Sequence, residues 1–291
     1  MRLPCVLTLL LVIVQGCGRE SSTGPTATGA TFDTTYGGDN GIVYAIHGAE
    51  PATEGAYPVF IYTVGAFGTY DSTSALAWID YMASRGFVAA TVEYPTGPRP
   101  GCPSVQEKAA GIYSGPDSAI AVLCGRARAN CMKGIVTAGH SLGSAMALLA
   151  ADYDSRVRAA LALGTGFDVV GPGNHEACLV DERVLPPDAV RAVNGESDAS
   201  FGRNMIDQLN SLTGMTCADA TNCLRANGSG WVLVPDDEAT DGLADHCYMG
   251  VVPSGESGSG CQYPSDPVWL SADVAWGRRA GADFLQAFTD R

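Results

Sequence analysis

Positive charge is scarce in this sequence. Its 291 residues include 17 Lys and Arg against 31 Asp and Glu, so the formal net charge is −14. Nucleic-acid backbones are bound by clustered basic side chains, and no such cluster is visible, so we expect no nucleic-acid partner. The hydrophobic content of 46% predicts a globular fold with a full core. No internal repeat is visible.

A hydrophobic run long enough to span a bilayer is also missing. The apolar stretch at 6–14, which follows Arg2, is short and fits a signal peptide better than a membrane helix. It ends in Val14-Gln15-Gly16-Cys17, which resembles the lipobox of bacterial lipoproteins, although Gln15 is unusual at its position. We expect a signal peptide at 1–17 with lipidation of Cys17, or else cleavage nearby with no role for Cys17. A Ser/Thr/Gly-rich tether is expected at 18–31 and one folded domain at 32–291.

Metal-binding patterns are absent as well. The sequence has only four His and no CxxC or paired-His spacing, which argues against a zinc site. Without Cys5 and Cys17, eight cysteines remain, and an even number in an exported protein predicts up to four disulfides. Eight cysteines allow 105 complete pairings. The pairs that are close in sequence, Cys217 with Cys223 and Cys247 with Cys261, are the ones we expect.

Short apolar runs alternate with segments of helical spacing along the rest of the chain. Strands are predicted at 42–46, 59–64, 87–94, 134–138, 157–163, 189–193 and 231–234. Helical segments are predicted at 74–84, 104–128, 142–152, 201–212 and 267–288. The alternation predicts an α/β fold with a mostly parallel central sheet and helices on both faces. Ligands of such sheets bind at the carboxyl ends of the strands.

Ser141 lies at one of these strand ends. The pentapeptide Gly139-His140-Ser141-Leu142-Gly143 fits G-x-S-x-G, follows the apolar run at 134–138 and precedes a predicted helix. This is the strand, sharp turn and helix of a nucleophile elbow, in which glycines leave room around a strained serine. The alternative, a helix N-cap serine, does not require both glycines. We therefore predict Ser141 as a nucleophile.

A serine nucleophile needs a base and a carboxylate that orients it. His246 lies in the loop after the last predicted strand, at the same sheet edge as Ser141, and is the expected base, with His175 as the main alternative. His140 adjoins Ser141 on a tight turn and is expected to pack locally, and His47 ends the first predicted strand. Asp198 follows the predicted strand at 189–193 and is the expected acid.

The order Ser141, Asp198, His246 is that of α/β-hydrolases. Residues 41–290 resemble the α/β-hydrolase superfamily, and the short-capped layout looks like its dienelactone hydrolase and bacterial cutinase or polyesterase branch. "GHSLG" resembles the elbow of that group, and "NGESD" resembles its Gly-x-x-Asp turn. Glu196, Asp237 and Asp245 stay open as alternative acids.

The resemblance also implies an oxyanion hole made of two backbone NH groups. One is expected from Leu142, directly after the nucleophile, and the second from Ala66, with Phe67 as the other choice. Relatives often carry a His or Pro before the glycine of this loop, and this chain has neither. Phe67 is a candidate substrate-binding residue, or else ordinary core.

The 25 residues at 164–188 are too few and too rich in Gly and Pro for a cap domain, which leaves an open cleft. The acidic run at 235–242 matches no calcium loop, and we interpret it as a solvated turn.

Together these features predict an exported, lipid-anchored or secreted serine hydrolase for carboxylic esters, polymeric or lipid esters among them. We expect no metal or other cofactor, no membrane contact except the N-terminal anchor, and a monomer. Acyl transfer, thioester or amide cleavage by the same triad, and a non-catalytic binding protein, are the alternatives.

Overall fold

A single sheet with parallel strands at its centre organises the chain. The computed structural model describes residues 28–37, 41–97, 101–167, 175–201, 205–218, 220–253, 261 and 263–290. The strands are β1 (Thr28–Gly37), β2 (Val43–Pro51), β3 (Val59–Thr63), β4 (Val88–Val92), β5 (Ile135–His140), β6 (Val157–Leu163), β7 (Val190–Gly195), β8 (Asn222–Leu224) and β9 (Gly230–Val234). Their order is β1-β2-β4-β3-β5-β6-β7-β9-β8. The run from β4 to β9 is parallel, and the antiparallel pairs lie at the two edges.

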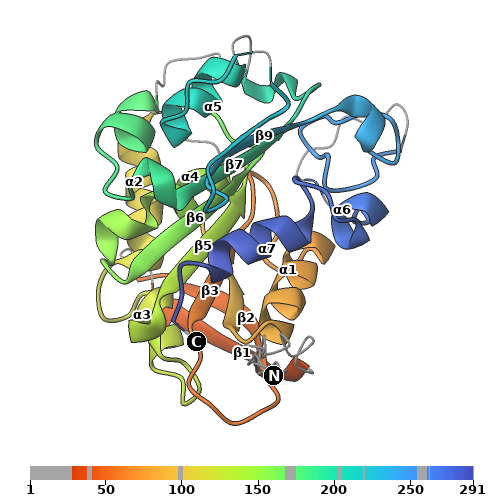
Figure 1. Ribbon diagram of the computed structural model, residues 1–291. Helices are drawn as coiled ribbons and strands as arrows, with labels where there is room; N and C mark the ends of the chain where they lie inside the picture. Colours follow the sequence, from red (N-terminus) through yellow and green to blue (C-terminus); the bar gives the residue numbers. More distant parts are fainter. Residues whose placement is uncertain are drawn as a thin grey trace, which may run out of the picture.

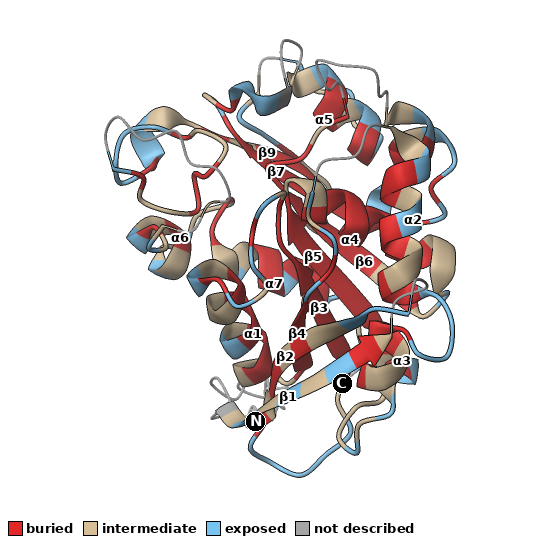
Figure 2. Cartoon of the chain, turned by 180° about the vertical axis from the view of Figure 1, so that it is seen from behind, coloured by how far each residue is buried: buried red, intermediate tan, exposed pale blue. Residues whose placement is uncertain are grey.

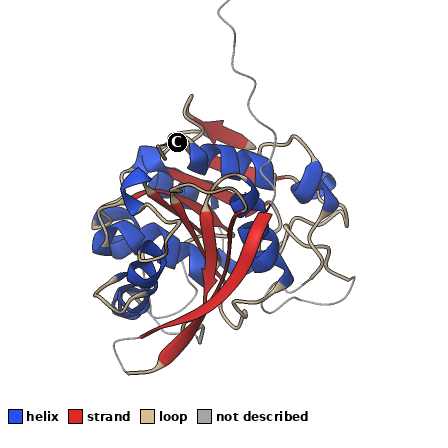
Figure 3. Ribbon diagram, turned by 90° about the horizontal axis from the view of Figure 1, so that it is seen from below, coloured by secondary structure: helices blue, strands red, loops and turns tan. Residues whose placement is uncertain are grey.

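Helices cover both faces of this sheet (Figures 1 and 3). They are α1 (Thr73–Ser84), α2 (Cys102–Tyr113), α3 (Ala119–Cys124), α4 (Leu142–Tyr153), α5 (Met205–Thr213), α6 (Pro267–Ser271) and α7 (Arg278–Gln286). α1 and α7 pack on one face, where Gly281 of α7 lies against Leu161 and Trp78. α4 packs on β3, β5 and β6, and α2 packs on α4 at the other face. The predicted α/β architecture is confirmed.

All seven predicted strands are present, with shifted bounds. The first extends to Pro51, so His47 lies inside β2 rather than at its end. Two predicted helical segments are each divided. The segment at 104–128 becomes α2 and α3, because Gly115 with φ of +86° and Pro116 interrupt it. The segment at 267–288 becomes α6 and α7, and Gly277 caps the second of them.

The folded part of the chain begins earlier than expected. β1 starts at Thr28, so the last four residues of the expected tether at 18–31 are strand. β1 is an edge strand whose residues are mostly exposed or half-buried, and it pairs with β2 alone (Figure 2). Its composition therefore lacks the apolar pattern of a core strand. The expected signal peptide, with Cys17, lies outside the described residues.

The parallel strands are buried on both faces, which explains their continuous apolar runs. Every residue of β3, β4, β5 and β7 is buried. All four tryptophans of the sequence are fully buried, and Trp78 of α1 meets Trp269 of α6 edge to face at 5.4 Å between ring centroids. Truncating a buried Trp to Ala costs about 3–5 kcal/mol, so this contact anchors the C-terminal helices firmly.

Four disulfides join the eight remaining cysteines. Cys217–Cys223 and Cys247–Cys261 are the two pairs expected from sequence spacing, and that prediction is confirmed. Cys124–Cys131 is a third local pair. Cys102–Cys178 spans 76 residues and ties α2 to the segment after β6. Four disulfides are compatible with an exported protein.

The connection between β6 and β7 has little secondary structure of its own. Its described residues form one π-helical turn at Ala177–Asp181 and one 3₁₀ turn at Pro187–Ala189. No cap domain is built from these described residues. Among the helices of the described ranges, none is long and apolar enough to cross a membrane.

Candidate active site

Ser141 occupies a strained backbone position between β5 and α4. Its φ of +53° and ψ of −121° are rarely adopted by residues other than glycine, and such a position costs about 1–3 kcal/mol. The Ser141 NH donates to the Leu163 carbonyl at 2.9 Å, which links the turn to the end of β6. The side chain makes no capping hydrogen bond to α4. This geometry disfavours the helix-cap interpretation of Ser141.

Both glycines of the pentapeptide are required by close packing. A Cβ on Gly139 would lie 2.1 Å from the Gly143 carbonyl oxygen, and a Cβ on Gly143 would lie 2.1 Å from the Thr63 carbonyl oxygen. The Thr63 hydroxyl donates to the Gly143 carbonyl at 2.7 Å. The first turn of α4 is therefore pressed against β3, as the elbow hypothesis predicts.

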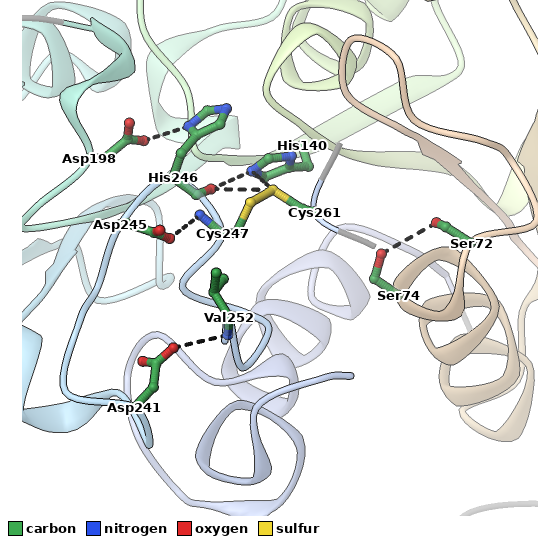
Figure 4. Close-up of a disulfide and its surroundings, with 10 residues drawn as sticks. All are labelled: Ser72, Ser74, His140, Asp198, Asp241, Asp245, His246, Cys247, Val252 and Cys261. Carbon is green, nitrogen blue, oxygen red and sulfur yellow. Dashed lines mark hydrogen bonds and ion pairs between the residues drawn. A yellow bond between two sulfur atoms is a disulfide. The ribbon is translucent and has the colours of Figure 1, made fainter. Parts of the chain in front are cut away.

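Asp198 and His246 form a hydrogen-bonded pair. His246 Nδ1 lies 2.8 Å from Asp198 Oδ2 (Figure 4). The Asp198 side chain is fully buried, and its other oxygen accepts from the Ser200 NH at 2.9 Å. Burial alone raises the pKa of Asp198, but the hydrogen bonds from His246 and Ser200 and the charge of His246 outweigh it, so the pKa is lowered. An ionised Asp198 makes Nδ1 the protonated nitrogen of His246 and leaves Nε2 as the acceptor.

Hydrogen bonds between successive strand ends bring these residues to one edge of the sheet. The Gly164 NH donates to the Val193 carbonyl at 2.8 Å, and the Ser197 NH donates to the Ala244 carbonyl at 2.9 Å. A Cβ on Gly164 would lie 2.7 Å from His140 Nε2 and 3.3 Å from His246 Cε1. Gly164 therefore contacts both the residue before Ser141 and the expected base.

The other three histidines are placed differently. His140 is buried beside His246, with ring centroids 4.7 Å apart, and its Nε2 lies 2.8 Å from the His246 carbonyl oxygen. His140 therefore packs against a residue 106 positions away in sequence and not, as was expected, against its own turn. His47 lies on β2, and its Nδ1 is 2.7 Å from Oδ1 of Asp33 on the edge strand β1. His175 is half-buried, its Nε2 has no hydrogen-bond partner among the described residues, and burial lowers its pKa.

The alternative acids have other roles. Glu196 accepts from the Asp236 NH at 3.1 Å, and Asp245 accepts from the Cys247 NH at 2.7 Å. Asp237 is exposed. Among the candidate acids, Asp198 is therefore the one that the structure brings to His246.

The loop after β3 lies directly against Ser141. It forms a β-turn closed by the Gly68 NH and the Gly65 carbonyl at 3.0 Å, and Phe67 in this turn has a φ of +60°. A Cβ on Gly65 would lie 3.0 Å from Ser141 Cβ. The Phe67 NH donates to the Thr96 carbonyl at 3.3 Å, whereas the Ala66 NH has no acceptor within the described part of the chain. This difference favours Ala66 over Phe67 as the second oxyanion donor. The Phe67 side chain is 62% exposed, so it is not core.

The acidic run at 235–242 is more than a solvated turn. Asp236 accepts from the Ala244 NH at 2.8 Å, and Glu238 accepts from Trp276 Nε1 at 2.6 Å. Asp241 accepts from the Val252 NH at 3.0 Å. These carboxylates fix the loop that carries His246. Across the described ranges, no group of three or more His, Cys, Asp or Glu side chains is arranged to hold a metal ion.

Sequence reasoning missed the residues that support the site from a distance, notably Lys108, Tyr94 and Asp266. Asp266 left a local signal, because Asp followed by Pro267 is a typical helix start. Nothing near Lys108 or Tyr94 in sequence indicates their partners, which lie in loops elsewhere in the chain.

Comparison with known proteins identifies the fold. No protein-family model matches the sequence, and no curated protein matches it. A cold-adapted esterase from an Arctic intertidal metagenomic library superposes with a TM-score of 0.51 at 15% identity, over 64% of this chain and 81% of that one. A protein provisionally assigned as a dienelactone hydrolase from Klebsiella pneumoniae gives a TM-score of 0.48 at 16% identity, over 71% and 86%.

A hypothetical protein from Pseudomonas aeruginosa gives a TM-score of 0.40 at 20% identity, over 55% of this chain, which spans half the length of that protein. The sheet order, the elbow after β5 and the likeness to the Arctic esterase define one fold class. The chain has the α/β-hydrolase fold.

Proposed function

We propose that this chain is a serine hydrolase that cleaves carboxylic esters, with Ser141, His246 and Asp198 as its triad. One observation carries the proposal: buried Asp198 and half-buried His246, joined at 2.8 Å, lie at the same sheet edge as the strained elbow of Ser141. A fold alone does not define an activity, so the proposal depends on this site.

In the first half of the reaction, Ser141 Oγ attacks the carbonyl carbon of the ester, and His246 Nε2 takes the hydroxyl proton. The carbonyl π electrons move to oxygen, and the resulting oxyanion accepts hydrogen bonds from the NH groups of Leu142 and Ala66. When the intermediate collapses, the C–O bond to the alcohol breaks, and the leaving oxygen takes the proton from His246. An acyl-enzyme and a free alcohol result.

In the second half, water attacks the acyl carbon while His246 Nε2 takes its proton. Collapse of the second oxyanion breaks the bond to Ser141 Oγ, which recovers the proton, and the carboxylic acid leaves. Asp198 keeps the proton on His246 Nδ1 and stabilises the imidazolium that forms in both halves. The lowered pKa of Asp198 suits this role, because the carboxyl stays ionised.

Labelling with a fluorophosphonate tests the nucleophile. We expect a mass shift on the peptide that contains Ser141 in the native protein and none in the Ser141→Ala variant. Ser155→Ala changes an exposed serine outside the site and serves as the matched control, with labelling equal to that of the parent. A native protein that stays unlabelled would favour a binding protein without catalysis.

Product analysis separates hydrolysis from acyl transfer. The same triad supports acyltransferase, thioesterase and amidase chemistry, because it does not choose the acceptor or the leaving group. In water with competing alcohols, the carboxylic acid should dominate. A dominant transesterified product would identify an acyltransferase, and faster turnover of matched thioesters or amides would reassign the substrate class.

Bulky or polymer-bound esters belong to the proposal. The described part of the connection between β6 and β7 is short, and the exposed Phe67 lies in the loop beside Ser141. A series of p-nitrophenyl esters of rising acyl length, followed by a polyester film, measures the preference. Release of soluble products from the film supports the polyesterase-like activity, and activity confined to short soluble esters contradicts it.

We further propose that the protein is exported and lipidated at Cys17, and that it is a monomer. The four disulfides support export. Metabolic labelling with palmitate should mark the native protein and not Cys17→Ser. Absence of label from the native protein in a processing-competent bacterium would favour free secretion. Light scattering of the protein without its lipid should give the monomer mass.

A further inference from the structure

Lys108 is a buried cation on α2. It is 5% exposed, and its Nζ donates to the carbonyl oxygens of Pro95 and Gly97, the latter at 2.5 Å. Burying an ammonium group is costly unless strong hydrogen bonds compensate, so lysine is almost never fully buried unless its charge is paired or hydrogen-bonded. Both acceptors belong to the loop that follows β4.

This loop supports the turn beside Ser141. The Thr96 carbonyl lies between Pro95 and Gly97 in sequence, and it accepts from the Phe67 NH at 3.3 Å. From the start of the same loop, the Tyr94 hydroxyl donates to the Val64 carbonyl. The chain on both sides of Ala66, at Val64 and at Phe67, is thus hydrogen-bonded to the loop at 94–97.

The turn needs such support, because Phe67 holds a positive φ that disfavours non-glycine residues by about 1–3 kcal/mol. If the Thr96 carbonyl were not held in place, the turn would relax toward a less strained backbone. The Ala66 NH would then point in another direction. The helix that carries Lys108 also packs on α4, where the Tyr153 hydroxyl donates to the Gln106 carbonyl at 2.8 Å. α4 begins with Leu142. α2 therefore contacts both the loop that holds the turn of Ala66 and the helix that begins with Leu142.

We propose that Lys108 is a positioning residue for the oxyanion hole: it fixes the loop at 95–97, which holds the turn at 65–68 so that the Ala66 NH faces the developing oxyanion. This inference rests on the proposed hydrolase function. Lys108 does not touch the substrate, and it lies more than 30 residues from Ala66 in sequence. Its role in holding the turn explains why its charge is buried.

Lys108→Met tests the inference, because methionine keeps the length of the side chain and removes its charge and donors. Lys133→Met is the matched control, since Lys133 is the other lysine of the sequence and lies at the opposite end of β5 from Ser141. Oxyanion donors act in the transition state, and losing one costs about 10²–10³ in kcat. For a displaced donor we expect kcat to fall roughly 10- to 100-fold with KM changed less than threefold. Lys133→Met should stay within twofold of the parent.

A second readout does not depend on the ester. The phosphoryl oxygen of a fluorophosphonate occupies the oxyanion hole during labelling, so the labelling rate of Lys108→Met should fall by a factor similar to that of kcat. Lys108→Arg keeps the charge and the donors and should recover part of both rates. If Lys108→Met does not fold, Lys108→Gln, which keeps donor groups at reduced reach, takes its place with the same expected direction.

A folded Lys108→Met or Lys108→Gln variant with kcat and labelling rate within threefold of the parent would overturn the inference. So would a rise in KM at unchanged kcat, which indicates a role in substrate binding. Failure of the hydrolase proposal is distinguishable, because it shows in the parent protein as absence of both ester turnover and labelling. Failure of the Lys108 inference shows only in the variants.

Discussion

The imidazole of His140 packs against the imidazole of His246, with ring centroids 4.7 Å apart, and its Nε2 donates to the His246 backbone carbonyl at 2.8 Å. The residue before the expected nucleophile thus holds the residue expected to be its base. The disulfide between Cys247 and Cys261 covers this pair, with Cys261 Sγ 3.7 Å from His140 Nε2 (Figure 4). Burial, with a smaller effect from the nearby His246, lowers the pKa of His140 to about 3.

This lowered pKa predicts a loss of stability in mild acid. Between pH 6.5 and 3 the unfolded chain binds a proton at His140 that the folded chain does not, so the free energy of unfolding falls as pH falls through this window. From pH 7 to pH 5 the contribution is about 2 kcal/mol. His140→Gln retains a donor for the His246 carbonyl and does not titrate. Urea unfolding at the two pH values should show a smaller acid loss in this variant by about that amount, and equal losses would contradict the prediction.

Asp198→Asn should reduce kcat strongly while leaving the fold intact. The amide of Asn presents a donor where the carboxylate accepted from His246 Nδ1, which favours the wrong tautomer and removes the stabilisation of the imidazolium. We expect a fall of roughly 10³- to 10⁴-fold in kcat by analogy with other triads. Asp237→Asn changes an exposed carboxyl of the neighbouring loop and should leave ester turnover unchanged. A comparable loss in both variants would reassign the acid.

Removal of the Cys247–Cys261 disulfide should affect activity as well as stability. The cross-link closes a separation of 14 residues, which corresponds to about 3 kcal/mol of stability in the chain-entropy description. Because Cys247 follows His246 directly, we also expect kcat to fall about tenfold in the double Cys→Ser variant. The same change at Cys217 and Cys223 removes a cross-link over 6 residues that ends within β8. That control should lose about 2 kcal/mol of stability and little activity. Equal kcat in the two double variants would show that the Cys247–Cys261 disulfide does not influence the candidate active site.

The parts of this fold that were predictable from sequence are those with a local signal. The run Ile135-Val136-Thr137-Ala138 reads as a strand because both of its faces are covered, and the glycines around Ser141 read as an elbow because only glycine fits there. β1 was missed because an exposed edge strand needs no apolar pattern, and β8 because three residues carry too little pattern.

The supports of the candidate site had no local signal, because their partners are distant in sequence. Glu238 resembles any solvated acid until Trp276 is seen to donate to it, 38 residues further on. Composition alone indicates a solvated turn for the acidic run at 235–242. Its structure depends instead on the backbone NH groups that donate to its carboxylates. Sequence order placed Ser141, Asp198 and His246 at one edge, and only the three-dimensional contacts distinguish Asp198 from the other acids.

Asp266 joins the N-terminal cap of α6 to the loop that carries His246. Its carboxylate is fully buried and accepts from the Val268 NH at 2.7 Å and from the NH and hydroxyl of Thr240, both at 2.8 Å. Asn caps helices as well as Asp does, so Asp266→Asn keeps the cap. Its amide nitrogen, however, replaces Oδ2 and faces the Thr240 NH, which then has no acceptor.

An unpaired buried donor costs about 1–3 kcal/mol, which lowers the melting temperature of a chain of this size by roughly 2–10 °C. Asp266 does not touch the reacting groups, so kcat of Asp266→Asn well below its melting point should stay within about tenfold of the parent. Thermal inactivation of ester turnover should shift downward together with the unfolding transition seen by circular dichroism. Asp273→Asn, at an exposed carboxyl near α7, should shift neither. An unchanged melting temperature in Asp266→Asn would show that the loop of His246 is held by its other carboxylates alone.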